Sequence, residues 1–348
     1  MRTRTHRGVA WAAAVVAVTL LSACGSNSTP ASPAGSSTTS LSTPAGDSSA
    51  AAPGSGGTVA AGPKTDVTVG VGGGTYLVSL STPFFAADGL NVVKQTVASG
   101  AAAIPLLLNG QIQFTAADSV GALTAISKGV PLVIVAMAAT SGSTAKNDAT
   151  GVLVKSGGDI KSAKDLSGKK IAVNGIGNTS QLSAAAAIDK LGGDSTKVHF
   201  VEIPPPTMAA GVAGGLVDAA VLSEPAITQG KSKGLRSLFS PMAEALPSVP
   251  LFVYITSKQY LAQHPDVVNK FAESMSKANT YESQHPDVVR AFAAKVLTLT
   301  PADAAAITLP AFVPATIGKP AMEQVQQLML KYKTIKAPVN LDTALYAP

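Results

Sequence analysis

The sequence predicts an α/β protein with two lobes. Short β-branched or apolar segments alternate with helical segments between Asp66 and Leu222, which is typical of sheets that carry helices on both faces. The alternation begins again near Gly151, after a first set of strands and helices, and this indicates a second unit of similar size. The folded part starts near Lys64 and has about 285 residues, which suits two lobes better than a single core.

The first unit alternates predicted strands with predicted helices, and we expect its strands to form a parallel sheet. Gly89 and Gly110 follow two of the helices, where glycine favours the left-handed backbone that ends a helix. The predicted strands are 66–72, 90–97, 112–116 and 131–138. The predicted helices are 82–88, 101–109 and 119–128.

The second unit repeats this alternation and leads into a helical C-terminal region. Its glycine-rich turn, Gly175 to Ser180, directly follows a strand and opens a helix that ends near Leu191. His264 and His285 each precede a Pro-Asp pair at a helix start, so we expect both at the surface. The other predicted strands are 151–154, 170–173, 198–203, 219–222 and 251–256, and the other predicted helices are 208–214, 266–282, 287–299 and 321–333.

Residues 1–23 have the anatomy of a secretory signal, with a basic start, an apolar stretch and small residues before the cut. The only cysteine, Cys24, comes directly after these small residues. This pattern resembles a bacterial lipoprotein signal, in which the cysteine becomes the lipidated first residue of the mature protein. An ordinary cleaved signal with an incidental cysteine is the alternative. We therefore expect a protein on the extracytoplasmic face of the cell membrane, anchored by a lipid on Cys24.

Composition narrows the choice of partners. Residues 24–63 are mostly Ser, Thr, Pro, Ala and Gly, so we expect a disordered tether whose ends lie on the order of 35 Å apart. Of the 26 basic and 20 acidic residues, Arg2, Arg4 and Arg7 would leave with the signal, and a net charge of +3 would remain. So small a charge argues against a nucleic-acid partner. A single cysteine also excludes an internal disulfide.

Four segments resemble the substrate-binding proteins of bacterial ABC importers for nitrate, sulfonate and taurine, a group that includes the thiamine-precursor binding proteins. They read FFAADGLNV (84–92), LLLNGQIQFTAADS (106–119), DLSGKKIAVNGIGNTS (165–180) and AGGLVDAAVLSEP (213–225). The resemblance implies a monomer with the two-lobed type 2 periplasmic-binding-protein fold. Lobe 1 would comprise 64–148 and 246–348, and lobe 2 would comprise 149–245. A small-molecule ligand would lie in the cleft between the lobes, and closure around it would present a surface to an ABC permease.

Ligands of open α/β sheets lie beyond the carboxyl ends of the strands, and five turns of this sequence follow such ends. Among them, Gly177 to Ser180 opens a helix, where unpaired amides and the positive helix end favour an anion or a carbonyl oxygen. The candidate ligand-binding residues of the five turns are Gly74, Thr75, Tyr76, Ser119, Thr140, Ser141, Asn178, Thr179, Ser180 and Glu224.

Each of these turns also has a purely structural interpretation. The Gly177 turn, like the one before Tyr76, could serve only to reverse the chain. Asp118 could be a simple helix N-cap. Thr140 and Ser141 could belong only to the crossover between the lobes, and Glu224 could bridge the hinge.

The charged residues argue against a strongly held anion. Arg236 and Arg290 are the only arginines after the signal, and neither lies on the five turns. The site therefore lacks a bidentate clamp for a sulfonate or carboxylate. A neutral or zwitterionic ligand, or a longer sulfonate, remains compatible with the sequence.

Two other functional classes stay open as alternatives. Some proteins that share this fold are enzymes, but no HExxH, GxSxG or metal-spaced cluster occurs here, so we expect no enzyme, no cofactor and no metal site. A purely structural lipoprotein would neither close nor gain stability from a ligand.

Overall fold

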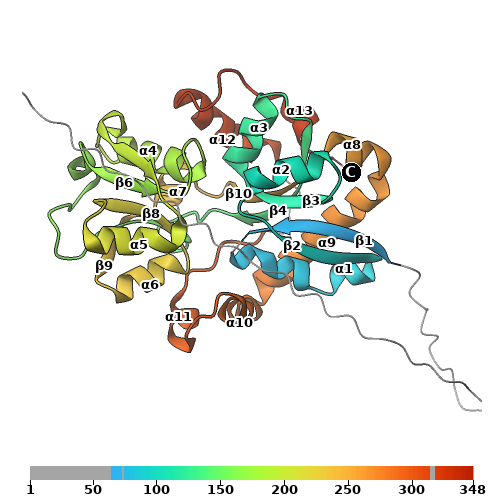
Figure 1. Cartoon of the computed structure of the whole chain (residues 1–348), viewed down its shortest axis with the longest axis horizontal. Helices are drawn as coiled ribbons and strands as arrows, with labels where there is room; N and C mark the ends of the chain where they lie inside the picture. Colours follow the sequence, from blue (N-terminus) through green and yellow to red (C-terminus); the bar gives the residue numbers. More distant parts are fainter. Residues whose placement is uncertain (1–63, 73, 314–317, 348) are drawn as a thin grey trace, which may run out of the picture. The chain divides into compact units, whose positions relative to one another are not determined.

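The computed structural model describes residues 64–72, 74–313 and 318–347. The predicted signal, Cys24 and the predicted tether lie outside these residues. The described chain forms two five-stranded sheets, each covered by helices (Figure 1). Within the described residues, no helix is both long and apolar enough to cross a membrane.

The first sheet has the order β2-β1-β3-β10-β4. Its strands β1 and β2 pair in parallel, as do β1 and β3, but β10 runs antiparallel to both of its neighbours. The four strands predicted for the first unit, β1 to β4, run in the same direction as expected, but β10 returns from the second lobe and enters between β3 and β4 from the opposite direction, so the whole sheet is mixed. The strands are β1 (Thr65–Val71), β2 (Leu90–Thr96), β3 (Phe114–Asp118), β4 (Leu132–Thr140) and β10 (Pro250–Ser257).

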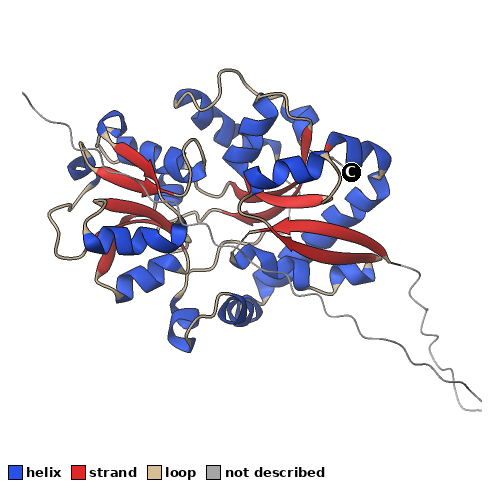
Figure 2. Ribbon diagram, viewed as in Figure 1, coloured by secondary structure: helices blue, strands red, loops and turns tan. Residues whose placement is uncertain are grey.

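Both faces of the first sheet are buried under helices. The 3-10 helix η1, α1 and α9 cover one face, while α2, α3, α12 and α13 cover the other (Figures 1 and 2). Nearly continuous burial of β4 follows from this arrangement. The helices of this lobe are η1 (Thr75–Ser81), α1 (Phe84–Ala87), α2 (Gly100–Leu108), α3 (Ser119–Ser127), α8 (Lys258–Gln263), α9 (Pro265–Gln284), α10 (Pro286–Val296), α11 (Pro301–Ala306), α12 (Lys319–Lys331) and α13 (Leu341–Ala344).

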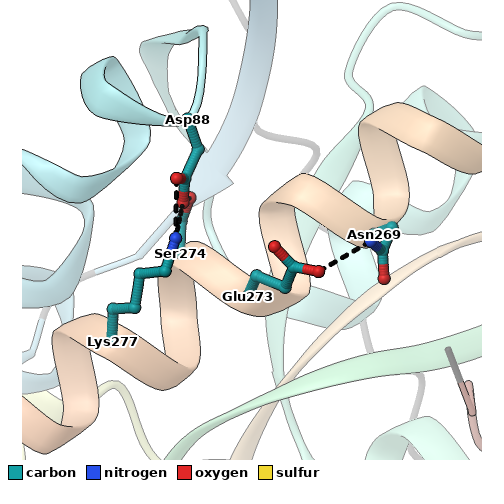
Figure 3. Close-up of polar contacts among 5 residues, drawn as sticks. All are labelled: Asp88, Asn269, Glu273, Ser274 and Lys277. Atoms are coloured by element: carbon teal, nitrogen blue, oxygen red, sulfur yellow. Dashed lines mark hydrogen bonds and ion pairs between the residues drawn. The ribbon is translucent and has the colours of Figure 1, made fainter.

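The long helix α9 is fixed to the sheet by an apolar stripe. Phe271 stacks on Phe114 of β3 with ring centroids 3.8 Å apart. At the end of α1, the Asp88 carboxylate accepts hydrogen bonds from Ser274 Oγ at 2.6 Å and Lys277 Nζ at 2.7 Å (Figure 3). Because α1 follows η1 directly, these contacts tie the η1–α1 segment to α9.

The second sheet has the order β7-β6-β8-β5-β9, and β5 runs antiparallel to β8 and β9. Helix α4 covers one face, while α5 and α6 cover the other (Figure 1). Its strands are β5 (Thr150–Lys155), β6 (Lys170–Val173), β7 (His199–Glu202), β8 (Ala219–Ser223) and β9 (Leu235–Phe239). Its helices are η2 (Ala163–Leu166), α4 (Thr179–Lys190), η3 (Ser195–Lys197), α5 (Pro205–Gly214), α6 (Ala226–Ser232) and α7 (Pro241–Ala245).

The two lobes are connected by two segments, 141–149 and 240–249, that lie side by side. Ser141 N donates to Val249 O at 2.9 Å, and Ser141 Oγ donates to Leu246 O at 2.6 Å. Val249 N in turn donates to Ser141 Oγ at 3.0 Å. Asp148 Oδ2 accepts from Ala243 N at 2.8 Å, which adds a second link between the connecting segments.

Candidate functional site

The carboxyl ends of strands in both lobes meet at one contact. Asp118 ends β3 in the first lobe, and Thr179 begins α4 just after β6 in the second. Thr179 Oγ1 donates to Asp118 Oδ1 at 2.6 Å, and Thr179 N lies 3.3 Å from the same oxygen. The structure therefore brings together two of the predicted turns, and it fills the predicted anion position at α4 with a carboxylate of the protein itself.

The other candidate residues at the α4 turn bond to one another. Asn178 is the N-cap of α4, and its side chain accepts from Gln181 N at 3.3 Å. Asn174 Oδ1 accepts from both Asn178 Nδ2 at 2.9 Å and Ser180 Oγ at 2.5 Å. The turn is thus a preformed network, as expected where polar groups must be held in fixed directions.

Ser119 differs from these residues because its hydroxyl is unused. It is the first residue of α3 and only 1% exposed, and its Oγ has no hydrogen-bond partner in the described part of the chain. Asp118 is the N-cap of α3, since its side chain accepts from Gly121 N at 2.9 Å. A buried hydroxyl without a partner, next to the contact between the lobes, is a group that a ligand can satisfy.

Tyr76 lies on η1 and packs against the first sheet. Its ring stacks on Phe252 of β10 with centroids 4.5 Å apart. Burial, and then the negative charge of Asp118, raise the pKa of Tyr76 to about 12, so the hydroxyl stays protonated. Gly74 precedes η1 with φ of 151°, and a Cβ there would lie 2.4 Å from the Tyr76 ring, so this turn requires glycine. Thr75 is the first residue of η1.

Thr140 and Ser141 leave β4 at the start of a connecting segment. The Thr140 hydroxyl donates to Ala311 O at 3.0 Å, and Thr140 and Ala311 also form a β-bridge. The Ser141 hydroxyl donates to Leu246 O of the second connecting segment. Both hydroxyls therefore hold backbone in this structure, and any ligand would compete with those bonds.

Glu224 follows β8 and joins parts of both lobes. Its carboxylate accepts from Thr228 Oγ1 at 3.1 Å and from Thr228 N at 3.1 Å, which caps α6. Thr308 N, which follows α11, lies 3.3 Å from Glu224 Oε1. These bonds link the start of α6 to the segment after α11, and a role of Glu224 at the hinge stays a prediction.

Sequence reasoning missed a group of buried polar side chains in the first lobe. Glu282 on α9 is 1% exposed and accepts from Ser79 Oγ of η1 at 2.7 Å. Glu282 Oε1, Asn279 Oδ1 and the Tyr254 hydroxyl have no hydrogen-bond partner among the described residues. The sequence did contain an indication that Glu282 is buried. It continues, at helical spacing, the buried stripe of Val268, Phe271, Met275 and Ala278.

The two arginines that follow the predicted signal do not pair with Glu282. Arg236 donates to Ile160 O, and Arg290 Nη1 donates to Ile307 O at 2.8 Å, so both arginines bind backbone carbonyls. Among the described residues, no group of three or more His, Cys, Asp or Glu side chains could hold a metal ion. A cavity of about 610 Å³ lies beside α7 and α12, and its lining contains none of the candidate residues.

Two sheets with these connections define the periplasmic-binding-protein fold, which solved structures also support. The alkanesulfonate-binding protein from Xanthomonas axonopodis pv. citri, bound to MOPS, superimposes with a TM-score of 0.68 over 82% of this chain and 99% of its own, at 18% identity. The desulfurization enzyme DszB superimposes with a TM-score of 0.60 over 81% of this chain and 96% of its own, at 16% identity. The fold therefore accommodates both a binding protein and an enzyme.

The chain belongs to the NMT1/THI5 like family, whose sequence profile matches residues 74–289. It is also 28% identical over 191 residues to the taurine-binding periplasmic protein of Escherichia coli K12. That similarity covers 55% of this chain and 57% of the Escherichia coli protein, so the chain spans little more than half of that relative.

Proposed function

We propose that this chain is an extracytoplasmic solute-binding lipoprotein that delivers a small organic solute to an ABC importer. Membership of the family, the fold, and a relative named for taurine binding support this assignment. The observation that carries it is the contact between Asp118 and Thr179. It joins the carboxyl ends of strands from both sheets, where ligands of α/β proteins bind. It also lies next to the Ser119 hydroxyl, which has no hydrogen-bond partner among the described residues.

In this proposal the ligand contacts both lobes. Tyr76 and Ser119 contribute from the first lobe, and Asn178, Thr179 and Ser180 from the second. The remaining candidates, Gly74, Thr75, Thr140, Ser141 and Glu224, shape the turns or the hinge around the ligand. Taurine-like and sulfonate-like solutes are the first to test because of the relatives, and nitrate and pyrimidine thiamine precursors come next.

We further propose that a lipid on Cys24 anchors the protein as a monomer on the outer face of the cell membrane. The basic start, the apolar stretch and the small residues before Cys24 support this part of the proposal. A soluble domain on a tether of about 40 residues could reach a permease in the same membrane.

Catalysis is the competing function, because DszB has the same fold. We propose binding without turnover, since the candidate side chains at the strand ends are hydroxyls, amides and carboxylates, most of which are already hydrogen-bonded to protein groups. Incubation with each candidate solute followed by mass spectrometry separates the two functions. Unchanged solute supports binding, whereas a converted solute would establish an enzyme.

The central experiment is a thermal-shift screen of the tether-free protein, combined with small-angle scattering. A solute at about a hundred times its dissociation constant should add roughly 2.7 kcal/mol to the free energy of unfolding. The same solute should reduce the radius of gyration as the lobes close. A solute that binds tightly without any change in radius would contradict closure, and a failure of all solutes would contradict the proposed function.

A further inference from the structure

At the strand ends, the amino terminus of α4 would be the natural binding site for an anion, but protein groups already fill it. The amino terminus of α4 carries a positive partial charge, but Thr179 N already donates to Asp118 Oδ1 and Gln181 N to Asn178 Oδ1. Both arginines bind backbone carbonyls elsewhere. A ligand that reaches this edge therefore meets acidic groups and hydroxyls.

Of the five buried side-chain atoms in the first lobe that lack partners within the described chain, three lie on β10 and α9. The Tyr254 hydroxyl, Asn279 Oδ1 and Glu282 Oε1 belong to side chains that are 1% exposed or less. Asn279 and Glu282 lie one turn apart on α9, and Asn279 Nδ2 donates to Met137 O of β4 at 2.8 Å. Tyr254 lies on β10 opposite Ala136, the residue before Met137, so the sheet places it next to the same turn of α9.

This group connects to the strand edge through Tyr76. Tyr76 of η1 stacks on Phe252 of β10, two residues before Tyr254, so Tyr76, Tyr254, Asn279 and Glu282 form a row between η1, β10 and α9. The Asp118 carboxylate at the strand edge adds to the raised pKa of Tyr76. Helix η1 lies along the row, because it carries both Tyr76 and Ser79, and Ser79 donates to Glu282. Buried polar atoms without partners are rare in native proteins, and a row of them points to a missing hydrogen-bond partner.

We propose that the solute carries an ammonium group and that this group binds in the row between η1 and α9, against Glu282, Asn279 and Tyr254. The inference rests on the proposed function and narrows its ligand to amine-bearing solutes. An ammonium has three N–H donors, and once Glu282 has lost its proton the row offers three acceptors, namely a carboxylate oxygen, an amide oxygen and a phenolic oxygen. A sulfonate has only acceptor oxygens, so it could accept from the Tyr254 hydroxyl but would leave Asn279 Oδ1 without a donor.

Taurine, ethanolamine and isethionate test this inference, since all three have a two-carbon skeleton. Taurine carries an amine and a sulfonate, ethanolamine an amine and a hydroxyl, and isethionate a hydroxyl and a sulfonate. Isothermal titration of the intact soluble chain should show that at least one amine binds and that isethionate binds at least about a hundredfold more weakly than taurine. Isethionate binding as tight as taurine would overturn the inference and leave the proposed function standing. A screen in which only solutes without an amine bind would likewise overturn the inference alone. A screen in which no solute binds would overturn both the inference and the proposed function.

Glu282→Gln supplies the matched variant, because glutamine keeps the acceptor for Ser79 and removes the charge. Its amine affinity should fall at least about tenfold, while its melting temperature at neutral pH should not fall. The control is Glu273→Gln on the exposed face of the same helix, where Glu273 accepts from Asn269 at 2.8 Å (Figure 3). Equal affinities of the two variants for the amine would contradict the inference.

Proton release gives an independent measurement. Burial raises the pKa of Glu282 to about 8, so the carboxyl is largely protonated at pH 7 before the solute binds. An ammonium that pairs with Glu282 should expel this proton. Titrations in buffers with different ionisation enthalpies should reveal a release of close to one proton for each amine bound to the native protein, and none for Glu282→Gln. The absence of proton release from the native protein would count against the site.

Discussion

A single oxygen of Asp118 accepts hydrogen bonds from the amino termini of two helices, one in each lobe. Asp118 Oδ1 accepts from Gly121 N of α3 at 2.9 Å, from Thr179 Oγ1 of α4 at 2.6 Å, and lies 3.3 Å from Thr179 N. One carboxylate thus caps a helix of its own lobe and a helix of the other. Negative charge is favourable at both helix ends, so this contact favours the arrangement in which the two strand edges meet.

Thr179→Val should favour an open arrangement of the lobes. Valine keeps the shape of threonine but removes the hydroxyl that donates to Asp118, and a hydrogen bond to a charged group contributes about 1.5–3 kcal/mol. The radius of gyration without ligand should increase, and solute affinity should fall roughly tenfold or more. Thr179→Ser retains the hydroxyl and should behave like the native protein in small-angle scattering. An unchanged radius in Thr179→Val would show that this bond does not hold the lobes together.

Ser119→Ala and Ser141→Ala should separate ligand binding from stability. The Ser119 hydroxyl has no partner among the described residues, so its removal should leave the melting temperature unchanged and weaken solute binding roughly five- to a hundredfold. The Ser141 hydroxyl bonds to Leu246 O and Val249 N, so its removal should lower the free energy of unfolding by about 1–3 kcal/mol. Chemical denaturation and titration of both variants check this, and the reverse pattern would remove Ser119 from the site.

Glu282 should make stability decrease with rising pH. Burial raises its pKa in the folded protein from 4.5 to about 8 and outweighs the opposing bond from Ser79. Between these values the unfolded chain has lost a proton that the folded chain keeps. The free energy of unfolding should therefore fall by about 1.4 kcal/mol per pH unit from roughly pH 5 to 8 through this group, and level off above that.

Denaturation of the native protein and Glu282→Gln across pH 5 to 9 isolates this contribution. Burial also raises the pKa of Asp148, but both proteins share that effect. The difference in stability between them should change in favour of the variant as the pH rises. A difference that is constant over the whole range would mean that Glu282 ionises normally.

Cys24→Ala should release the protein from the membrane or leave an unprocessed precursor, because the lipid would have no attachment point. Cell fractionation and mass spectrometry of the N-terminus provide the measurement. A variant that remains membrane-bound with a normally matured N-terminus would exclude the lipoprotein assignment. Ser22→Thr, two residues before the proposed attachment point, serves as a control that should still be lipidated.

The local pattern was sufficient for most strands and for several helix ends. Apolar runs such as 131–138 match β4, and glycine ends the helices that precede Gly110 and Gly192. Other elements were less visible. The helix expected at 82–88 is confined to the short α1, because Pro83 stands at its N-cap, and the 3-10 helix η1 that precedes it was not expected. Strand β9, at the edge of the second sheet, was not expected because its alternation is weak.

By itself, the sequence determined the α/β class, the restart of the pattern at the second unit, the family resemblance and the turns at the strand ends. These features depend on neighbours in the chain, so spacing and residue type reveal them. Only the tertiary structure decided the direction of β10, the partner of Thr179 and the burial of Glu282. Each depends on residues that are far apart in sequence, such as Asp118 and Thr179 or Ser79 and Glu282. A helix amino terminus can bind any suitable anion, and in this fold the anion is the Asp118 carboxylate of the protein itself.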